Sequence, residues 1–150
     1  MTTKNFPAMK LLSFTTETTL AEIGQYVGIK PKELMDEAQQ LGLRIEGPQH
    51  WIYYGMDGNP QTRFKLEIGI PIAVEASVSE TFAYTQTQPI ECAVITHHGA
   101  WETLHESYAK IIGEIMASGK TMSGITRELY HNVDFEKPER NITEIQIGLM

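Results

Sequence analysis

The sequence is short of basic residues and of cysteine. Its 150 residues include 12 lysines and arginines against 19 aspartates and glutamates, a formal net charge of −7. A nucleic-acid-binding surface needs a concentrated positive face to displace counterions, so we expect no direct nucleic-acid binding. The single cysteine, Cys92, excludes an internal disulfide framework, and its strand-like surroundings favour a small buried side chain.

Long apolar runs and processing signals are also missing. No stretch approaches the ~20 apolar residues that span a bilayer, and the first residues lack the pattern of a signal peptide. We therefore expect a cytoplasmic protein without membrane contact. The histidines show no recurrent metal-ligand spacing, and the adjacent His97 and His98 would face opposite ways in a strand. No glycine-rich phosphate loop or nucleophile elbow occurs either, so we expect no metal and no cofactor.

Two segments, 31–71 and 108–148, correspond to each other at a constant spacing of 77 residues without a gap. Repetition at this period indicates a duplicated structural unit. At the matched position Trp51/Glu128, one copy has a large aromatic residue and the other an acid. The identical pairs include Gly42 with Gly119, Gly47 with Gly124, Tyr53 with Tyr130, Asp57 with Asp134, and Glu67 with Glu144.

Each copy has the pattern of a helix followed by two strands. Helices are predicted from Pro31 to about Leu41 and from Trp101 to about Ala117, each closed by a glycine. A further helix is expected from a capping box at Thr19 to about Val27, ending at Gly28. Residues 1–9 are expected to be a loose lead-in. Strands are predicted at 11–14, 51–54, 64–70, 81–87, 93–97, 126–132 and 142–149.

The expected fold class is α+β. It is a duplicated βαββ module with pseudo-twofold symmetry, with antiparallel sheets, helices on one face, and a ligand cleft between the halves. A single domain would cover 1–150, with pseudo-repeats at about 8–72 and 81–150 and a connector at 73–80.

Alternation in the strands suggests where chemistry could occur. Residues two apart in a strand share a face, so Ile52 and Leu129 are expected on the helix-covered side. An acid among aromatic rings suits an organic cation, and the same carboxyl could act as a general acid or base. Alternatively, these are surface aromatics beside a solvated acid, because Glu-x-Tyr is a weak motif. The residues expected together on the other face are Trp51, Tyr53, Glu128 and Tyr130.

Two further residues are candidates for the same cleft. Trp101 opens the second helix and is either a cleft wall or a core aromatic. Glu144, like its counterpart Glu67, lies opposite the apolar residues of its strand. Both acids could line the cleft or have a structural hydrogen-bonding role.

Several segments together resemble the GyrI-like small-molecule-binding domain, the effector domain that follows DNA-binding heads in multidrug-sensing and AraC-type regulators. The specific part lies in about 90–149, and the first half contributes 47–54 and 65–71. The resemblance implies two βαββ halves around a ligand cleft, with a buried glutamate at Glu128 that meets cationic drugs. The segments are 95–102 (ITHHGAWE), Gly119, Gly124, 128–130 (ELY) and 141–147 (NITEIQI).

The sequence departs from the family pattern in two ways. Ala100 stands where a proline usually follows the His-Gly element. No helix-turn-helix head is present among the 150 residues, so we do not expect this chain itself to be such a transcription regulator.

Three functions follow as hypotheses. The first is a stand-alone binding domain for bulky apolar or cationic small molecules, with Glu128 supplying charge and aromatic walls around it. The second is a hydrolase, because some stand-alone members that this chain resembles open cyclopropane-bearing toxins. Glu128 would then be the general base and Tyr130 would orient the water. The third is an inhibitor of a topoisomerase-like protein partner, as one relative is, although no sequence feature marks an interface.

Overall fold

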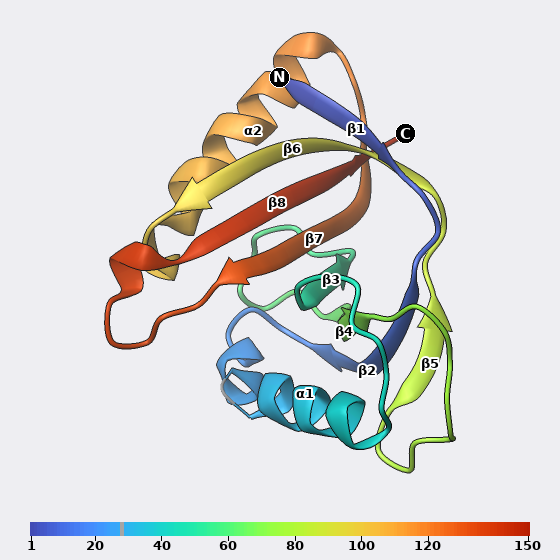
Figure 1. The fold of residues 1–150 in the computed structure, drawn as a ribbon. Coiled ribbons are helices and arrows are strands. Elements are labelled where there is room, and N and C mark those ends of the chain that lie inside the picture. The colour runs from blue at the N-terminus through green and yellow to red at the C-terminus, as the bar shows by residue number, and fades with distance from the viewer. Residues whose placement is uncertain (28) are drawn as a thin grey trace.

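The structure is a computed structural model that describes residues 1–27 and 29–150. These residues form an antiparallel sheet with two α-helices and short 3-10 helices (Figure 1). The predicted helix stop at Gly28 lies outside the described residues. The strands are β1 (Thr2–Phe6), β2 (Lys10–Thr18), β3 (His50–Tyr54), β4 (Phe64–Pro71), β5 (Ala83–Gln86), β6 (Ile90–His98), β7 (Met122–Asn132) and β8 (Ile142–Leu149). The helices are η1 (Ile23–Tyr26), α1 (Lys30–Gln40), η2 (Trp101–Thr103), α2 (Leu104–Ser118) and η3 (Pro138–Arg140).

The two halves share one sheet, because β3 and β7 pair with each other at its centre. The strand order is β1-β6-β8-β7-β3-β4-β2-β5. Read from either end, this order brings matching strands to matching places. The registers agree as well: His50 lies opposite Gly69, and Arg127, 77 residues after His50, lies opposite Gln146. The topology is therefore consistent with the duplication inferred from the sequence.

The first nine residues are not the loose lead-in expected from the sequence. Thr2–Phe6 is a strand, and it pairs with β6 of the other half. In the same way β5 crosses over to pair with β2. Each half therefore has one leading strand more than the expected βαββ unit, and that strand is exchanged. Local sequence could not reveal these two pairings, because the paired residues are at least 70 positions apart.

The exchange curls the sheet. β1 and β2 lie towards opposite ends of the strand order, yet only residues 7–9 connect them. Three residues span at most ~11 Å, so the two ends of the sheet must approach each other, as Figure 1 shows where β1 runs into β2. The crossing segments bond directly: the Met9 N–H donates to the Thr87 hydroxyl at 3.0 Å, and the Thr87 N–H donates to the Met9 carbonyl at 2.9 Å.

The two main helices follow their sequence signals. Pro31 lies in the first turn of α1, and Leu34 and Ala38, four residues apart, are buried against the sheet. Gly42 and Gly119 follow the two helices with φ of 69° and 76°, a left-handed conformation that side chains rarely adopt. The helix predicted from Thr19 is instead a turn and the short η1.

Both helices cover the sheet face that carries Trp51 and Tyr53. The α1 core joins these two residues to Leu34 and Ile68, while a second core packs α2 against Ile145 and its neighbours on β8. The expectation that Ile52 and Leu129 face the helices is therefore wrong. Both are nevertheless buried, on the helix-free face. Because the curled sheet buries both faces of its central strands, apolar character did not distinguish one face from the other.

Candidate functional site

A cavity of about 880 Å³ lies on the helix-covered face, over the seam where β3 pairs with β7. Trp51, Tyr53 and Tyr130 come from the two seam strands. One wall comes from η1 and α1, and the other from η2 and the segment after β7. The cavity therefore lies between the halves, as the expected ligand cleft does. The residues lining these walls include Ile23, Val27, Pro31, Met35, Trp101, Leu104, His131, Val133 and Phe135.

The aromatic residues of this cavity contact one another edge to face. The rings of Trp51 and Tyr130 are 5.9 Å apart and nearly perpendicular, and Trp101 lies 5.7 Å from the other side of Tyr130. The Trp101 indole donates a hydrogen bond to the Thr143 hydroxyl at 3.3 Å, which holds the ring in place. The structure thus brings together the predicted wall residues. It adds Phe135, 5.9 Å from Trp101 and 68% exposed, whose place in a polar turn gave no signal in the sequence.

Glu128 lies beside these aromatics and is only 6% exposed. Its Oε1 accepts hydrogen bonds from the hydroxyls of Tyr53, at 3.1 Å, and Tyr130, at 2.6 Å. Its Oε2 accepts one from Tyr108 on α2. None of the ion pairs among the described residues includes Glu128. Glu128 is thus a buried carboxylate held by three phenols and by no cation.

Tyr108 is the member of this group that sequence reasoning missed. Its spacing from Ile111 and Ile115 is that of the buried side of a helix, which gives no sign of a carboxylate partner. Burial, reinforced by the negative charge of Glu128, raises the pKa of Tyr53, Tyr108 and Tyr130 well above that of a free tyrosine. The three phenols therefore remain protonated donors.

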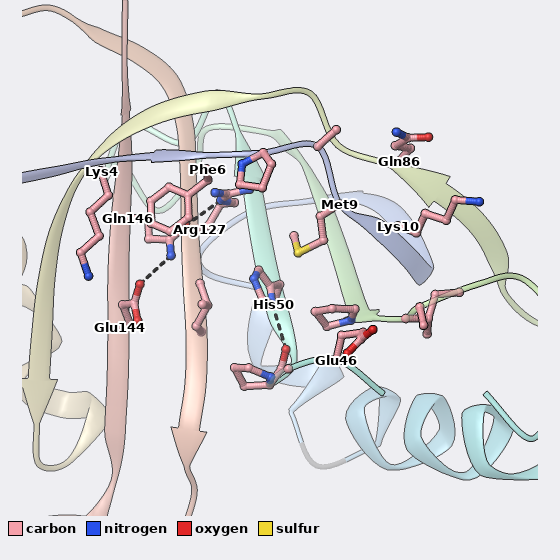
Figure 2. A pocket seen from close by; sticks show the side chains of 18 residues that line it. Lys4, Phe6, Met9, Lys10, Glu46, His50, Gln86, Arg127, Glu144 and Gln146 are labelled. Carbon is pink, nitrogen blue, oxygen red and sulfur yellow. Dashed lines mark hydrogen bonds between the residues drawn. The ribbon is translucent and has the colours of Figure 1, made fainter. Parts of the chain in front are cut away.

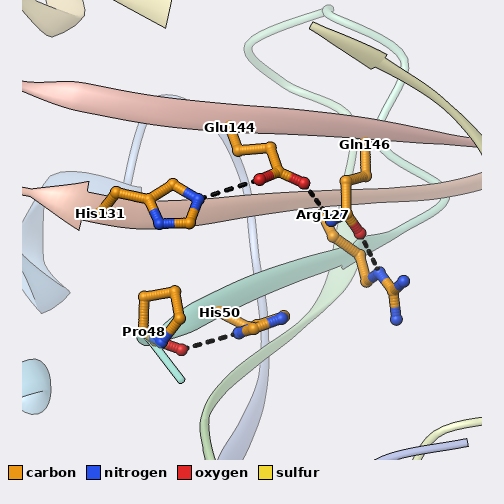
Figure 3. A network of polar contacts seen from close by, with 6 residues as sticks. All are labelled: Pro48, His50, Arg127, His131, Glu144 and Gln146. Carbon is orange, nitrogen blue, oxygen red and sulfur yellow. Dashed lines mark hydrogen bonds and ion pairs between the residues drawn. The ribbon is translucent and has the colours of Figure 1, made fainter. Parts of the chain in front are cut away.

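The structure separates Glu144 from the other site candidates. Glu144 lies opposite Leu129 in the β7–β8 register and shares its face, away from the helices. There it lines a second cavity, of about 740 Å³ (Figure 2). Its carboxylate contacts His131 Nε2 at 2.9 Å and accepts from Gln146 Nε2 at 2.6 Å (Figure 3). In the structure, Glu144 takes the hydrogen-bonding role that the sequence had left open.

His97 and Cys92 lie within the packed structure and not in the aromatic cavity. His97 bonds the hydroxyls of Ser107, at 2.7 Å, and Thr103, at 3.0 Å, and so ties β6 to the start of α2. Cys92 is buried, as predicted, and burial raises the pKa of its thiol. Within residues 1–27 and 29–150, no group of three potential metal ligands comes together. Over the same residues, no helix has the length and apolar character to cross a membrane.

The α+β fold leaves a cavity between its halves whose volume lies within the range of small-molecule sites. The sequence model of the GyrI-like small molecule binding domain matches residues 1–150, and the chain belongs to that family. No curated protein sequence matches the chain.

Several solved structures share the fold. The crystal structure of the EcmrR C-terminal domain has a TM-score of 0.81 at 15% identity, covering 99% of this chain and 96% of that one. SAV2435 bound to tetraphenylphosphonium has a TM-score of 0.64 at 14% identity, covering 99% and 93%. A hydrolase encoded by lin2189 from Listeria innocua has a TM-score of 0.62 at 10% identity, covering 99% and 91%. At these identities the likenesses show the fold alone.

Proposed function

We propose that this chain binds bulky aromatic cations in the cavity on the helix-covered face. Glu128 supplies the negative charge, and Trp51, Tyr53, Trp101 and Tyr130 supply the aromatic surface. The observation that carries the proposal is the buried carboxylate of Glu128, which has no cationic partner among the described residues and lies beside an aromatic cavity. The pseudo-repeats at about 8–72 and 81–150 would each contribute one wall of a single binding domain.

Electrostatics favours a cation over a neutral or anionic ligand. A buried charge is costly unless it is compensated, and the phenol hydroxyls satisfy the oxygens of Glu128 without neutralising its charge. Glu128 is not itself a lining residue of the cavity, but Tyr53 and Tyr130, which are, both donate hydrogen bonds to its carboxylate. A cation on the ring faces would gain cation–π attraction from the rings and Coulomb attraction to the buried carboxylate.

Gln49 adds a second feature that suits a positively charged ligand. It lines the same cavity, and its Nε2 donates to the Pro31 carbonyl at 2.7 Å, which identifies the oxygen as the other amide atom. That oxygen, Oε1, is buried and has no hydrogen-bond partner among the described residues. An unpartnered buried acceptor is costly, so a ligand with a donor or a positive charge would compensate it.

A hydrolase remains the alternative, and the fold is shared with a protein described as a hydrolase. The geometry of Glu128 favours binding instead. Both carboxylate oxygens already accept hydrogen bonds from tyrosines, whereas a general base must reach the proton of a water molecule. Incubation with a cyclopropane-bearing alkylator followed by mass spectrometry distinguishes the two: a stoichiometric complex indicates a binder, and accumulating ring-opened product indicates a hydrolase.

Calorimetric titration with tetraphenylphosphonium tests the binding proposal. Glu128→Gln should weaken binding by about tenfold or more, the cost of one charge-assisted contact. The neutral triphenylphosphine oxide should bind both proteins equally. Glu102→Gln is the matched control, because it removes the same charge from an exposed residue beside Trp101. Equal affinity of the wild type and Glu128→Gln for the cation would show that Glu128 has no charge role.

A further inference from the structure

We propose that the cavity on the helix-free face is a second ligand site, which takes a small amphipathic organic anion. The carboxylate or phosphate group of the ligand would bind the guanidinium of Arg127, and its apolar body would fill the rest of the cavity. This site lies behind the same β3–β7 seam as the cation cavity but shares no side chain with its aromatic walls. The inference does not depend on the proposed function.

Arg127 is a buried cation without an acidic partner. It is 3% exposed, and none of the ion pairs in the described part of the chain includes it. Its Nε donates to Gln146 Oε1 at 2.9 Å, while its two terminal nitrogens point away from Gln146 (Figure 3). A guanidinium has five donor hydrogens in a rigid fork that matches a carboxylate or phosphate. A contact with the Cys92 thiol takes part of this fork, and the Arg127 side chain also lines the cavity.

The surroundings of Arg127 leave its charge uncompensated. The ring of Phe6 lies 5.1 Å from the guanidinium carbon and covers one face of the fork. Burial lowers the pKa of Arg127, yet an arginine does not lose its proton in a protein. A buried charge that cannot be neutralised by deprotonation favours an external counter-charge. An anion entering the cavity would supply it.

The acids that line this cavity do not occupy the guanidinium. Glu144 is engaged by His131 and by Gln146 Nε2, and it forms no ion pair with Arg127 among the described residues, although its charge acts on Arg127 from a longer distance. Glu46 is exposed and lies across the cavity from Arg127 (Figure 2). His50, the repeat counterpart of Arg127, adds no second charge, because burial lowers its pKa from 6.5 to about 4. The other two cations of the lining, Lys4 and Lys10, are exposed, so Arg127 is the buried cationic centre among the lining residues, and it suits a ligand with one anionic group.

The cavity also has an apolar part, beside its polar lining residues. Phe6, at the end of β1, and Met9, in the segment that joins β1 to β2, lie on the side of the cavity away from Glu46 (Figure 2). Pro48 and Leu129 add to the apolar lining. A volume of about 740 Å³ lies within the range of small-molecule sites. An inorganic anion would leave these apolar side chains unused. The ligand therefore needs an apolar body as well as an acidic head.

Adjacent charges in β7 give the two faces opposite preferences. Arg127 and Glu128 are consecutive and so project to opposite faces of the sheet. The negative residue lies with the aromatic cavity and the positive one with the helix-free cavity. The seam is thus polarised from one face to the other, which favours a cation on one side and an anion on the other.

Nuclear magnetic resonance of the ¹⁵N-labelled full chain tests this site. The probes are benzoate, phenyl phosphate and the neutral isostere benzamide, each titrated to ~10 mM, a range that covers millimolar dissociation constants. We expect saturable shifts of the Arg127 Nε–H signal and of the backbone amides of Phe6 and Met9 with the two anions, and none with benzamide. Arg127→Lys should weaken binding and Arg127→Gln should abolish it. Lys4→Gln, an exposed cavity residue, should weaken binding about twofold to fivefold.

Three results would overturn the proposal: shifts that never saturate, equal binding of benzamide, or unchanged benzoate affinity in Arg127→Gln. If Arg127→Gln does not fold, two measurements still test the site: the comparison of benzoate with benzamide on the wild type, and the benzoate affinity of Lys4→Gln. Unchanged affinity in Lys4→Gln would then count against the site. Shifts confined to the Trp101 indole would place the anion in the other cavity and also refute the site. Trp101→Ala separates the two proposals, since it should weaken tetraphenylphosphonium binding and leave benzoate binding unchanged.

Discussion

Trp51 and Glu128, which occupy the same position in the two copies of the repeat, lie directly opposite each other in the β3–β7 pair. Among the register partners of β3 and β7, Trp51 and Glu128 are the two that also correspond to each other in the repeat. A symmetric dimer of one repeat would have the same residue twice at this point. A single chain with two diverged copies can instead place an aromatic ring opposite an acid, so the side chains around the seam differ between the two halves.

Both tryptophans line the aromatic cavity, so the proposed binding of a cation there should change their fluorescence. We expect tetraphenylphosphonium to change the emission of Trp101→Phe, in which Trp51 is the remaining tryptophan. Affinity should fall about twofold to fivefold, because phenylalanine is a weaker cation–π partner. If saturating ligand left the Trp51 emission unchanged, the ligand would not lie over the seam.

The three tyrosines around Glu128 should make the protein sensitive to alkali. Their raised pKa values mean that, above about pH 10, the unfolded chain loses protons that the folded protein keeps. The stabilisation of the folded protein by these protonated tyrosines is complete below about pH 10, and it declines as the pH rises further. The free energy of unfolding, from urea titrations at several pH values, should therefore fall with increasing pH. Tyr130→Phe should reduce the slope by up to about 1.4 kcal/mol per pH unit, and an unchanged slope would contradict the raised pKa of Tyr130.

His50 should titrate far below an ordinary histidine. Burial lowers its pKa to about 4, with Arg127 adding to the effect and the Pro48 carbonyl and Glu144 opposing it. Between about pH 6.5 and 4 the unfolded state binds a proton that the folded state does not, so stability should fall as pH falls, by up to about 3 kcal/mol.

Histidine ring resonances measure this directly. The His50 signal should stay constant down to about pH 5. His50→Gln should flatten the pH dependence of stability, while the exposed control His105→Gln should leave it unaltered. A His50 signal that moved near pH 6.5 would contradict the prediction.

The duplicated cores should behave as independent units. Ile68 and its counterpart Ile145 are each fully buried, in separate clusters. They lie on β4 and β8 with β3 and β7 between them, roughly 14 Å apart at ordinary strand spacing. Replacing either with valine should cost about 1 kcal/mol, and the two effects should add to within ~0.5 kcal/mol in urea unfolding. Val78→Ala, at an exposed position, is the control and should leave the free energy of unfolding nearly unchanged. A double mutant whose effect differs from the sum of the single effects by clearly more than ~0.5 kcal/mol would contradict the independence of the two cores.

Much of the architecture could be read from the sequence because its signals are local or repeated. Helical spacing, glycine stops and strand alternation identified both helices and most strands. Period-2 alternation also paired Trp51 with Tyr53 and Glu128 with Tyr130 on shared faces, which the structure confirms. These inferences need only the geometry of a short segment of backbone.

Long-range packing decided the rest. Nothing near Thr2–Phe6 indicates that it pairs with β6, and nothing in β3 shows which of its two buried faces receives the helices. The roles of Tyr108 and Arg127 also depend on residues that are distant in sequence. Tyr108 on α2 donates to Glu128 on β7, 20 positions away in the sequence. Arg127 is a buried charge without an ion pair among the described residues because of the strands around it. The sequence by itself determined the repeated elements and the asymmetric pair at positions 51 and 128. The curl of the sheet, which depends on contacts between its two ends, decided which side chains share a cavity.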